Sequence, residues 1–475
     1  MKKIEKREIL LILGIAISAS IMIFQIPLAA GDEIWNFQNI YKMVNGYQIY
    51  TDANVIITPI FFWIGFVLFK GFGANIFIFR LFDVFVYTIV AFLVYQMLKQ
   101  LKIEKTKAIL YTLIFHYFSY DLVTGGASYN TLAVLFVLIG TYYSLKEMAS
   151  NKFIILNGIL MYLIFFTKQN IGAYYVIATI LVQIMIEGRN KKVIFNILKQ
   201  LGIAFVLSMG TLGILYIQGV FWDFINIAFL GIREFGSQNS ILDPICMAHM
   251  LICMITVISA IILRKHVTKE EDKNIKILLA IGIPMLLITY PIVNVAHTML
   301  AMEVLLILLL YLTHLMLNQF LSPKIVEGVT IILSVSLIAL CISPLSRILT
   351  YEWVIKDYHH PYYGLSVSTP MLEHIRKVNE YINNQEGKVI MLSDKAAIYN
   401  IPEKRNNGKM DLVFLGNLGY HGEERLIEEI SHMKNTQILM YEPLFWQESA
   451  KMLNYLKEHY EVVGKIESYD IYQIP

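Results

Sequence analysis

Two adjacent carboxylates, Asp32 and Glu33, follow directly on an uninterrupted apolar run from Ile9 to Ala30. A carboxylate held beside a bilayer is partly desolvated, which raises its pKa and suits it to act as a general base toward a hydroxyl group. The same residue types also stabilise the positive N-terminal end of a following helix. The sequence by itself leaves both roles open.

The composition is that of a polytopic membrane protein. Of the 475 residues 57% are hydrophobic and 16% are charged, and the mean hydropathy is +0.58. A soluble protein of this length would carry more polar surface. The run from Ile9 to Ala30 is long for a signal peptide and no A-x-A cleavage pattern follows it, so we interpret it as a retained span. All three cysteines lie in apolar segments, which predicts neither disulfides nor a metal site.

Apolar runs of about 20 residues predict the membrane spans. They indicate eleven transmembrane helices, at 9–30, 76–98, 108–122, 129–146, 153–167, 171–187, 201–220, 243–263, 276–292, 297–318 and 326–345. The apolar stretch 58–69 is too short to count as a span.

The distribution of basic residues fixes the expected orientation. With the N-terminus inside, the predicted cytoplasmic segments carry 20 Lys and Arg residues and the short outer loops carry only four, Lys42, Lys70, Lys168 and Arg233. This bias agrees with the positive-inside rule. It places Asp32, Glu33 and the C-terminal tail on the outer side.

The segment 31–75 is neither a span nor an ordinary loop. Phe37, Ile40 and Tyr41 recur at helical spacing between polar residues, and Gly46 follows. This pattern predicts an interfacial amphipathic helix. A second short helix is expected to begin at Thr58-Pro59.

The C-terminal part changes character. Strand-like runs at 388–393, 410–415, 437–441 and 469–473 alternate with helical patterns at 423–433 and 446–459. This alternation predicts a small α/β domain. We therefore divide the chain into a transmembrane domain, 1–345, whose outer loop is 31–75, and an extracytoplasmic α/β domain, 346–475.

Residues 31–81 carry a family resemblance. The Asp-Glu pair after the first span, the turn Gly46-Tyr47-Gln48-Ile49-Tyr50, the run Pro59 to Trp63, and Phe69-Lys70-Gly71-Phe72-Gly73 followed by Arg80-Leu81 together resemble the GT-C glycosyltransferases. The likeness is to the branch of the protein O-mannosyltransferases and aminoarabinose transferases, glycosyltransferase family 39. The resemblance covers this segment only, and family members usually have two prolines where this chain has Thr58-Pro59.

The resemblance implies an enzyme that moves a sugar from a polyprenyl-phosphate carrier to a cell-envelope acceptor, with inversion at the anomeric carbon. By position Asp32 matches the catalytic carboxylate, and Glu33 would share that role or hold the sugar. The branch implies no cofactor and no metal. The expected partners are the lipid-linked donor, a glycan, lipid or protein acceptor and the bilayer, with no nucleic acid. The expected location is a bacterial plasma membrane.

A phosphate leaving group needs positive charge, and cations are scarce on the predicted outer face. Lys168, Arg233 and His297 are the candidates for binding the donor phosphate. Each has a structural alternative: Lys168 as a snorkelling interface residue, Arg233 as a surface partner of Glu234 and Asp223, and His297 as a helix cap.

Two further ionisable sites lie within predicted spans. Arg80 and Asp83 are three residues apart, which favours a local pair on one helix. Glu303 lies inside the tenth span and points away from His297, so its partner is not predictable. Such charges would also suit a transporter or flippase of lipid-linked glycans, which we keep as the alternative function.

Overall fold

The computed structural model describes residues 5–29, 31–119, 128–148, 150–236, 243–290, 292–320, 355–442 and 448–475, with a few single positions between these ranges. The chain divides into two compact units. Unit 1 comprises residues 1–25, 81–210 and 240–351, and unit 2 comprises residues 26–80, 211–239 and 352–475.

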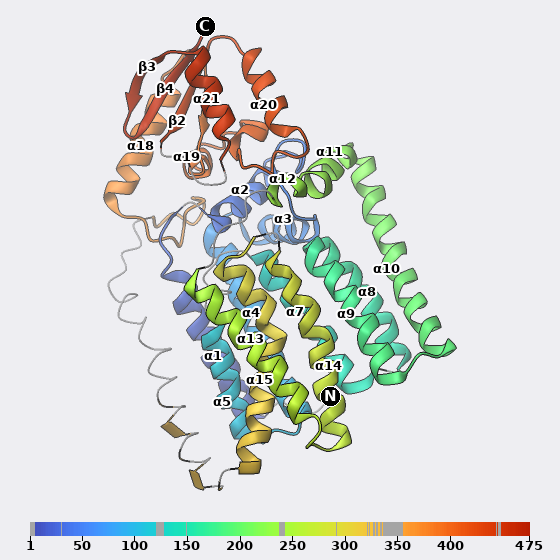
Figure 1. The fold of residues 1–475 in the computed structure, drawn as a ribbon. Coiled ribbons are helices and arrows are strands. Elements are labelled where there is room, and N and C mark those ends of the chain that lie inside the picture. Colours follow the sequence, from blue (N-terminus) through green and yellow to red (C-terminus); the bar gives the residue numbers. More distant parts are fainter. Residues whose placement is uncertain are drawn as a thin grey trace. The chain divides into compact units, whose positions relative to one another are not determined.

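Unit 1 is helical throughout its described part (Figure 1). Its helices are α1 Lys6–Phe24, α5 Lys105–Phe118, α7 Ser128–Glu147, α8 Asn151–Thr167, α9 Gln169–Glu187, α13 Pro244–Leu263, α14 Lys269–Met285, η2 Leu286–Thr289 and α15 Val295–Phe320. Two helices cross the division between the units, α4 Ile76–Gln100 and α10 Lys191–Ile217.

Local signals in the sequence set several of these helix ends. Thr268 and Glu271 form a reciprocal capping box at the start of α14, and the Ser150 side chain accepts from Phe153 N–H at the start of α8. Asp243 caps α13, whose first residue is Pro244. Each cap supplies an acceptor for a backbone N–H that has no partner within the helix.

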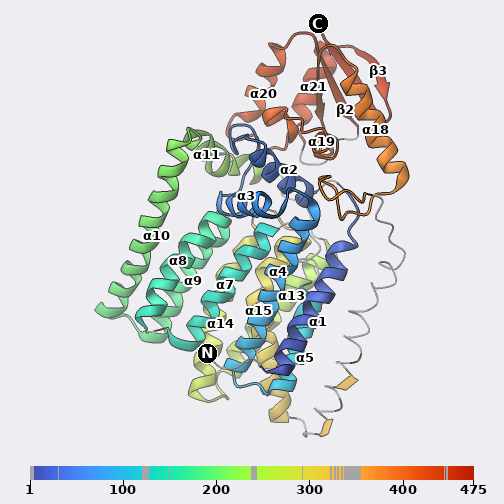
Figure 2. The same ribbon diagram turned by 180° about the vertical axis from the view of Figure 1, so that it is seen from behind.

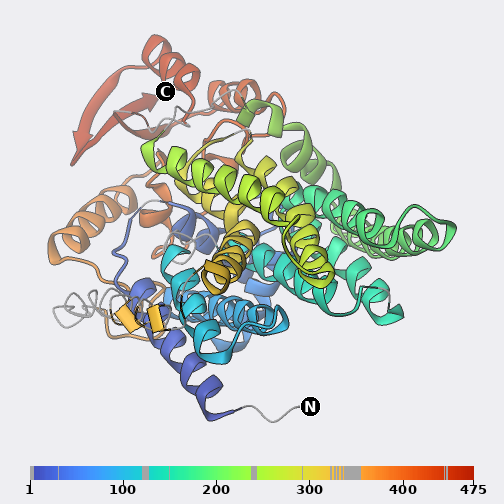
Figure 3. The same ribbon diagram turned by 60° about the horizontal axis from the view of Figure 1, so that its bottom comes forward.

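The bundle of unit 1 packs α7, α8, α9 and α14 side by side, and α15 against both α13 and α14 (Figures 2 and 3). A buried polar network fastens α8, α9 and α10: Asn157 bonds Gln200 at 2.6 Å, Gln200 bonds Gln183 at 2.9 Å, and Tyr175 bonds Asn157 at 2.6 Å. Buried amides satisfied in this way fix one arrangement of the three helices.

The structure agrees with most of the predicted spans. The first ten predicted ranges each contain a helix. Among the described residues six helices, α1, α4, α9, α10, α13 and α15, are long and apolar enough to cross a membrane. The range 326–345 and the domain boundary at 345/346 lie largely outside the described residues, so the count of eleven is not confirmed and the boundary stays a prediction.

Unit 2 begins with the segment that contains the paired carboxylates. Its N-terminal and middle helices are α2 Asp32–Val44, α3 Ile60–Phe72, α11 Phe221–Ile225, η1 Asn226–Leu230 and α12 Ile232–Gly236. The 13 residues of α3 are too few for a span, as expected from the sequence.

The C-terminal part of unit 2 is the predicted α/β domain. Its elements are α18 Thr369–Asn383, β1 Lys388–Leu392, α19 Ala396–Asn400, η3 Gly408–Asp411, α20 Gly422–Ser431, β2 Thr436–Tyr441, α21 Ala450–His459, β3 Val462–Ile466 and β4 Tyr469–Ile474. The sheet order is β1-β2-β4-β3, with β1 and β2 parallel and the other pairs antiparallel.

Helices cover both faces of this sheet. Leu426 and Ile430 of α20 and Leu456 of α21 share a buried core with Ile390 and Ile438 of the strands. On the opposite face Tyr381 of α18 donates to Gln437 of β2 at 2.7 Å. Because alternate strand residues point to opposite faces, a sheet covered on both sides has near-continuous apolar strands, as β1 and β2 do.

One predicted strand is wrong and one strand was missed. Residues 410–415 form the end of η3 and a single bridge from Phe414 to Glu448 instead of a strand. The apolar run there packs into the core from an irregular segment. The edge strand β3 escaped prediction because three of its five residues are exposed, so it lacks the apolar pattern of its neighbours.

Candidate active site

Asp32 is the first residue of α2, and Gly31 is its N-cap. Gly31 has φ 153° and ψ −179°, a conformation that side chains with a Cβ rarely adopt. This turn places both carboxylates in the first helical turn, where the N-terminal dipole of α2 stabilises negative charge. Asp32 is partly exposed, whereas Glu33 is buried.

Glu33 is held by Arg80 in a two-point ion pair. The Nε of Arg80 lies 2.7 Å from Glu33 Oε1, and its Nη2 lies 2.8 Å from Oε2. The same Nη2 donates to the carbonyl oxygen of Ile26 at 2.9 Å. The Arg80 side chain is fully buried, so the pair is shielded from water and geometrically fixed.

The spacing of Arg80 and Asp83 predicted a local pair on one helix, whereas the structure has the Arg80 guanidinium bonded to Glu33. The guanidinium bonds the Glu33 carboxylate and the carbonyl oxygen of Ile26, both from the segment that leads from the first span into α2. A buried arginine needs a carboxylate with matching geometry, and Glu33 offers both oxygens. Its remaining nitrogen, Nη1, is buried and has no hydrogen-bond partner among the described residues.

The polar face of α2 is buried within unit 2, which corrects the expectation of an interfacial helix. Lys42 is 5% exposed and forms an ion pair of 2.6 Å with Asp411, and it also donates to the carbonyl oxygen of Asp52 at 3.1 Å. Trp35 Nε1 donates to the carbonyl oxygen of Asp394 at 2.8 Å. Helix α2 is thus fastened to the α/β domain along its length.

Arg233 lies on α12 and is exposed. The carboxylate of Asp223, its predicted surface partner, instead bonds Lys409 at 2.7 Å. Arg233 therefore has the access that a ligand contact requires.

Lys168 joins α8 to α9 and is 6% exposed. Its Nζ lies 2.6 Å from Asn130 Oδ1 and 5.2 Å from the centre of the Tyr129 ring. A snorkelling lysine would extend to the aqueous interface, so this burial argues against that alternative. A buried ammonium held by an amide and an aromatic ring is a fixed positive charge.

His297 lies in the first turn of α15, where its backbone N–H is capped by Asn294 Oδ1 at 2.8 Å. Its Nδ1 is buried without a hydrogen-bond partner among the described residues, and the imidazole is within electrostatic range of Lys168. Glu303, further along α15, accepts from the Ser119 hydroxyl at 3.0 and 3.2 Å. Within unit 1 His297 thus lies in electrostatic range of Lys168, and Glu303 has a separate partner, Ser119.

The sequence-predicted site residues fall into two groups. Asp32, Glu33 and Arg233 belong to unit 2, and Lys168 and His297 belong to unit 1. Sequence reasoning missed the pairs Glu33–Arg80 and Lys42–Asp411. A signal for the first existed, because an arginine in an apolar run requires a buried carboxylate somewhere in the chain. Among the described residues no group of three or more His, Cys, Asp and Glu side chains could hold a metal ion.

Comparison with known proteins gives a likeness in structure alone. No family model and no curated protein sequence matches the chain. The crystal structure of apo ArnT from Cupriavidus metallidurans, an aminoarabinose transferase, has a TM-score of 0.60 at 10% identity, with 98% of this chain and 97% of that chain covered.

A second structure, the Archaeoglobus fulgidus oligosaccharyltransferase in complex with Zn and sulfate, has a TM-score of 0.48 at 11% identity, with 90% of this chain and 68% of that chain covered. At 10% identity the likeness to ArnT concerns the fold. The chain has an ArnT-like fold, which agrees with the predicted fold class of a helical membrane part with a small C-terminal sheet.

Proposed function

We propose that this protein is a membrane glycosyltransferase that moves a sugar from a polyprenyl-phosphate-linked donor to a cell-envelope acceptor at the outer face of the membrane. The observation that carries the proposal is the carboxylate pair at the start of α2, with Glu33 fixed by Arg80 and Asp32 partly exposed beside it. The ArnT-like fold over nearly the whole chain supports the same reaction class.

The two carboxylates then have different tasks. Both oxygens of Glu33 are engaged by Arg80, so Glu33 is a positioning residue that fixes the first turn of α2. Asp32 is the general base: it takes the proton from the acceptor hydroxyl as that oxygen attacks the anomeric carbon. The bond from this carbon to the phosphate oxygen breaks, and the polyprenyl phosphate leaves with the bonding electrons.

The leaving phosphate requires nearby positive charge. In this proposal Lys168 supplies the fixed charge and His297 supplies a donor from its buried Nδ1. Arg233, which is exposed on a short helix, would join only when the donor is bound.

The test measures sugar transfer by the purified full chain in nanodiscs. The donor is the lipid-linked sugar that accumulates in cells lacking the protein, supplied as an extract of their envelope lipids. Asp32→Asn should lower the rate by about 10²–10⁴, because it removes the base and keeps nearly the same shape. The matched control is Asp357→Asn, an exposed aspartate whose contact with the His359 N–H an amide oxygen can keep.

Full activity of Asp32→Asn would remove Asp32 from the chemistry and leave it as a helix-end residue. Movement of an intact lipid-linked glycan across the bilayer, with no sugar transfer, would replace the proposal by the flippase alternative.

A further inference from the structure

The α/β domain gathers side chains at one edge of its sheet. Lys395 follows the end of β1 by three residues, Tyr441 is the last residue of β2, and Tyr469 is the first residue of β4. The register pairs Leu392 with Met440, and Tyr441 with Tyr469, so these three positions meet at the same edge. In α/β sheets the carboxyl ends of parallel strands are where ligands bind.

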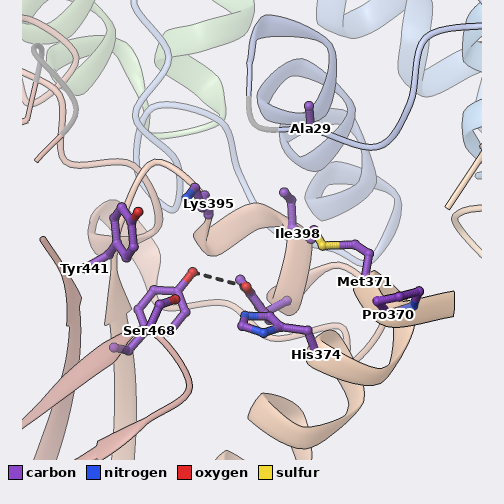
Figure 4. A pocket seen from close by; sticks show the side chains of 10 residues that line it. Ala29, Pro370, Met371, His374, Lys395, Ile398, Tyr441 and Ser468 are labelled. Carbon is purple, nitrogen blue, oxygen red and sulfur yellow. Dashed lines mark hydrogen bonds between the residues drawn. The ribbon is translucent and has the colours of Figure 1, made fainter. Parts of the chain in front are cut away.

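A cavity of about 520 Å³ opens at this edge. Figure 4 shows Tyr441 and Lys395 on one side of it and Met371, Pro370 and His374 on the other. This volume falls in the range of pockets that take small ligands. The remaining lining comes from Ala29, Ile398, Tyr399, Ser468 and Tyr469.

The aromatic lining is rigid. Tyr399 and Tyr469 are buried, and their hydroxyl groups share a hydrogen bond of 3.2 Å, the dashed line in Figure 4. Tyr441 is partly exposed, and its ring lies 5.8 Å from that of Tyr469 and 4.0 Å from the Lys395 ammonium. The cavity therefore combines a preformed aromatic surface with hydrogen-bond donors at its rim.

The charges around the cavity do not favour an anion. His374 Nδ1 lies 3.5 Å from the Glu467 carboxylate. The Asp394 carboxylate, next to Lys395 in the chain, is within electrostatic range of both buried phenols. A ligand with an apolar face and several neutral hydroxyl groups suits aromatic rings, single donors and balanced charge better than a phosphate does.

We propose that this cavity binds a neutral sugar ring, as the site that holds the acceptor of the transferase. The α2 helix that starts at Asp32 contacts this edge directly, since Trp35 donates to the carbonyl oxygen of Asp394, and Ala29 of the preceding segment lines the cavity. The sugar ring packs against Tyr441, and Lys395 and His374 donate to its hydroxyl groups. The acceptor role rests on the proposed function, whereas sugar binding as such does not.

The test measures binding in the absence of donor. The full chain in nanodiscs is titrated with the methyl glycosides of D-glucose, D-galactose, D-mannose and L-arabinose, and with inorganic phosphate, by saturation-transfer difference NMR. At least one glycoside should bind. Tyr441→Ala should weaken that binding at least tenfold, and Tyr441→Phe, which keeps the ring, should change it less than threefold. The matched control is Tyr420→Ala, a tyrosine of the same unit that does not line the cavity.

Three results would overturn the proposal: no glycoside binds, binding survives Tyr441→Ala, or phosphate alone binds and is lost in Lys395→Gln. The two proposals fail separately. Asp32→Asn should lose transfer and keep sugar binding. If the wild type transfers sugar but binds no glycoside in this cavity, only the acceptor-site proposal fails. If it binds a glycoside but transfers no sugar, only the proposed function fails.

Discussion

The ion pair between Glu33 and Arg80 separates two adjacent carboxylates into different roles. Because the guanidinium is fully buried and bonds both oxygens of Glu33, the pair acts as a rigid clamp between α4 and the start of α2. Since both oxygens of Glu33 are engaged by the guanidinium, we assign Glu33 the positioning role. The neighbouring Asp32 is partly exposed.

This clamp predicts strong energetic coupling. Removing one partner of a buried pair leaves an uncompensated charge, which typically costs about 3–5 kcal/mol. We expect Glu33→Gln and Arg80→Gln each to lower the thermal midpoint of the purified protein markedly, and the double variant to lower it by less than the sum of the two shifts. Additive shifts would mean that the two side chains act independently.

The buried ammonium of Lys168 leads to a prediction on donor binding. A charge-assisted contact to phosphate contributes about 1.5–3 kcal/mol, so Lys168→Gln should raise the half-saturating donor concentration roughly ten- to a hundredfold. Glutamine can still bond Asn130, which limits the effect on stability. A lowered thermal midpoint with unchanged donor saturation would instead make Lys168 a structural residue and leave the phosphate to His297 or Arg233.

At the scale of elements, periodicity and composition were sufficient to predict a helix in each of the first ten predicted spans, the strands β1, β2 and β4, and the helices α20 and α21. The burial of α2 could not be predicted in this way. Its polar residues follow the pattern of a solvated face, and only tertiary contacts such as Lys42 with Asp411 show that the face is covered. The strand predicted at 410–415 is wrong for the same reason. The segment includes the end of η3, where the Asp411 carboxylate forms the ion pair with Lys42 of α2, and the apolar pattern does not reveal this tertiary contact.

The turn before α18 leads to a pH prediction. His360 is half-buried, and desolvation lowers its pKa, while the nearby Asp357 opposes that shift. Its Nδ1 accepts from the Tyr362 N–H at 3.0 Å, which requires the unprotonated nitrogen. The folded state therefore binds a proton less readily than the unfolded chain, so stability is full above about pH 6.5, the ordinary pKa of histidine, and declines as the pH falls below it.

The measurement compares thermal midpoints at pH 7.5 and pH 5.5. His360→Asn keeps an acceptor for the Tyr362 N–H but cannot be protonated. We expect the variant to lose less stability than the wild type over this interval, and equal losses would show that other groups cause the decline.

At the scale of the whole molecule, the distribution of basic residues predicts that segment 31–75 and the C-terminal domain lie on the outer side. Single cysteines at Asn45 and Asn384, both exposed, should react with a membrane-impermeant maleimide in intact cells. A cysteine at Asn190, in a predicted inner loop, should not react. The background carries alanine at the three native cysteines. Labelling of Asn190, or of only one outer position, would contradict the topology.

Helix α10 exposes most of its apolar surface to the surrounding lipid. Its 27 residues extend about 40 Å, which exceeds the roughly 30 Å hydrocarbon thickness of a bilayer. Only 17% of its most apolar stretch is buried in protein. Lipid acyl chains therefore face most of that stretch among the described residues, and the helix runs from unit 1 into unit 2 without interruption. The lipids of the host membrane thus contact a helix that continues into the unit that carries Asp32.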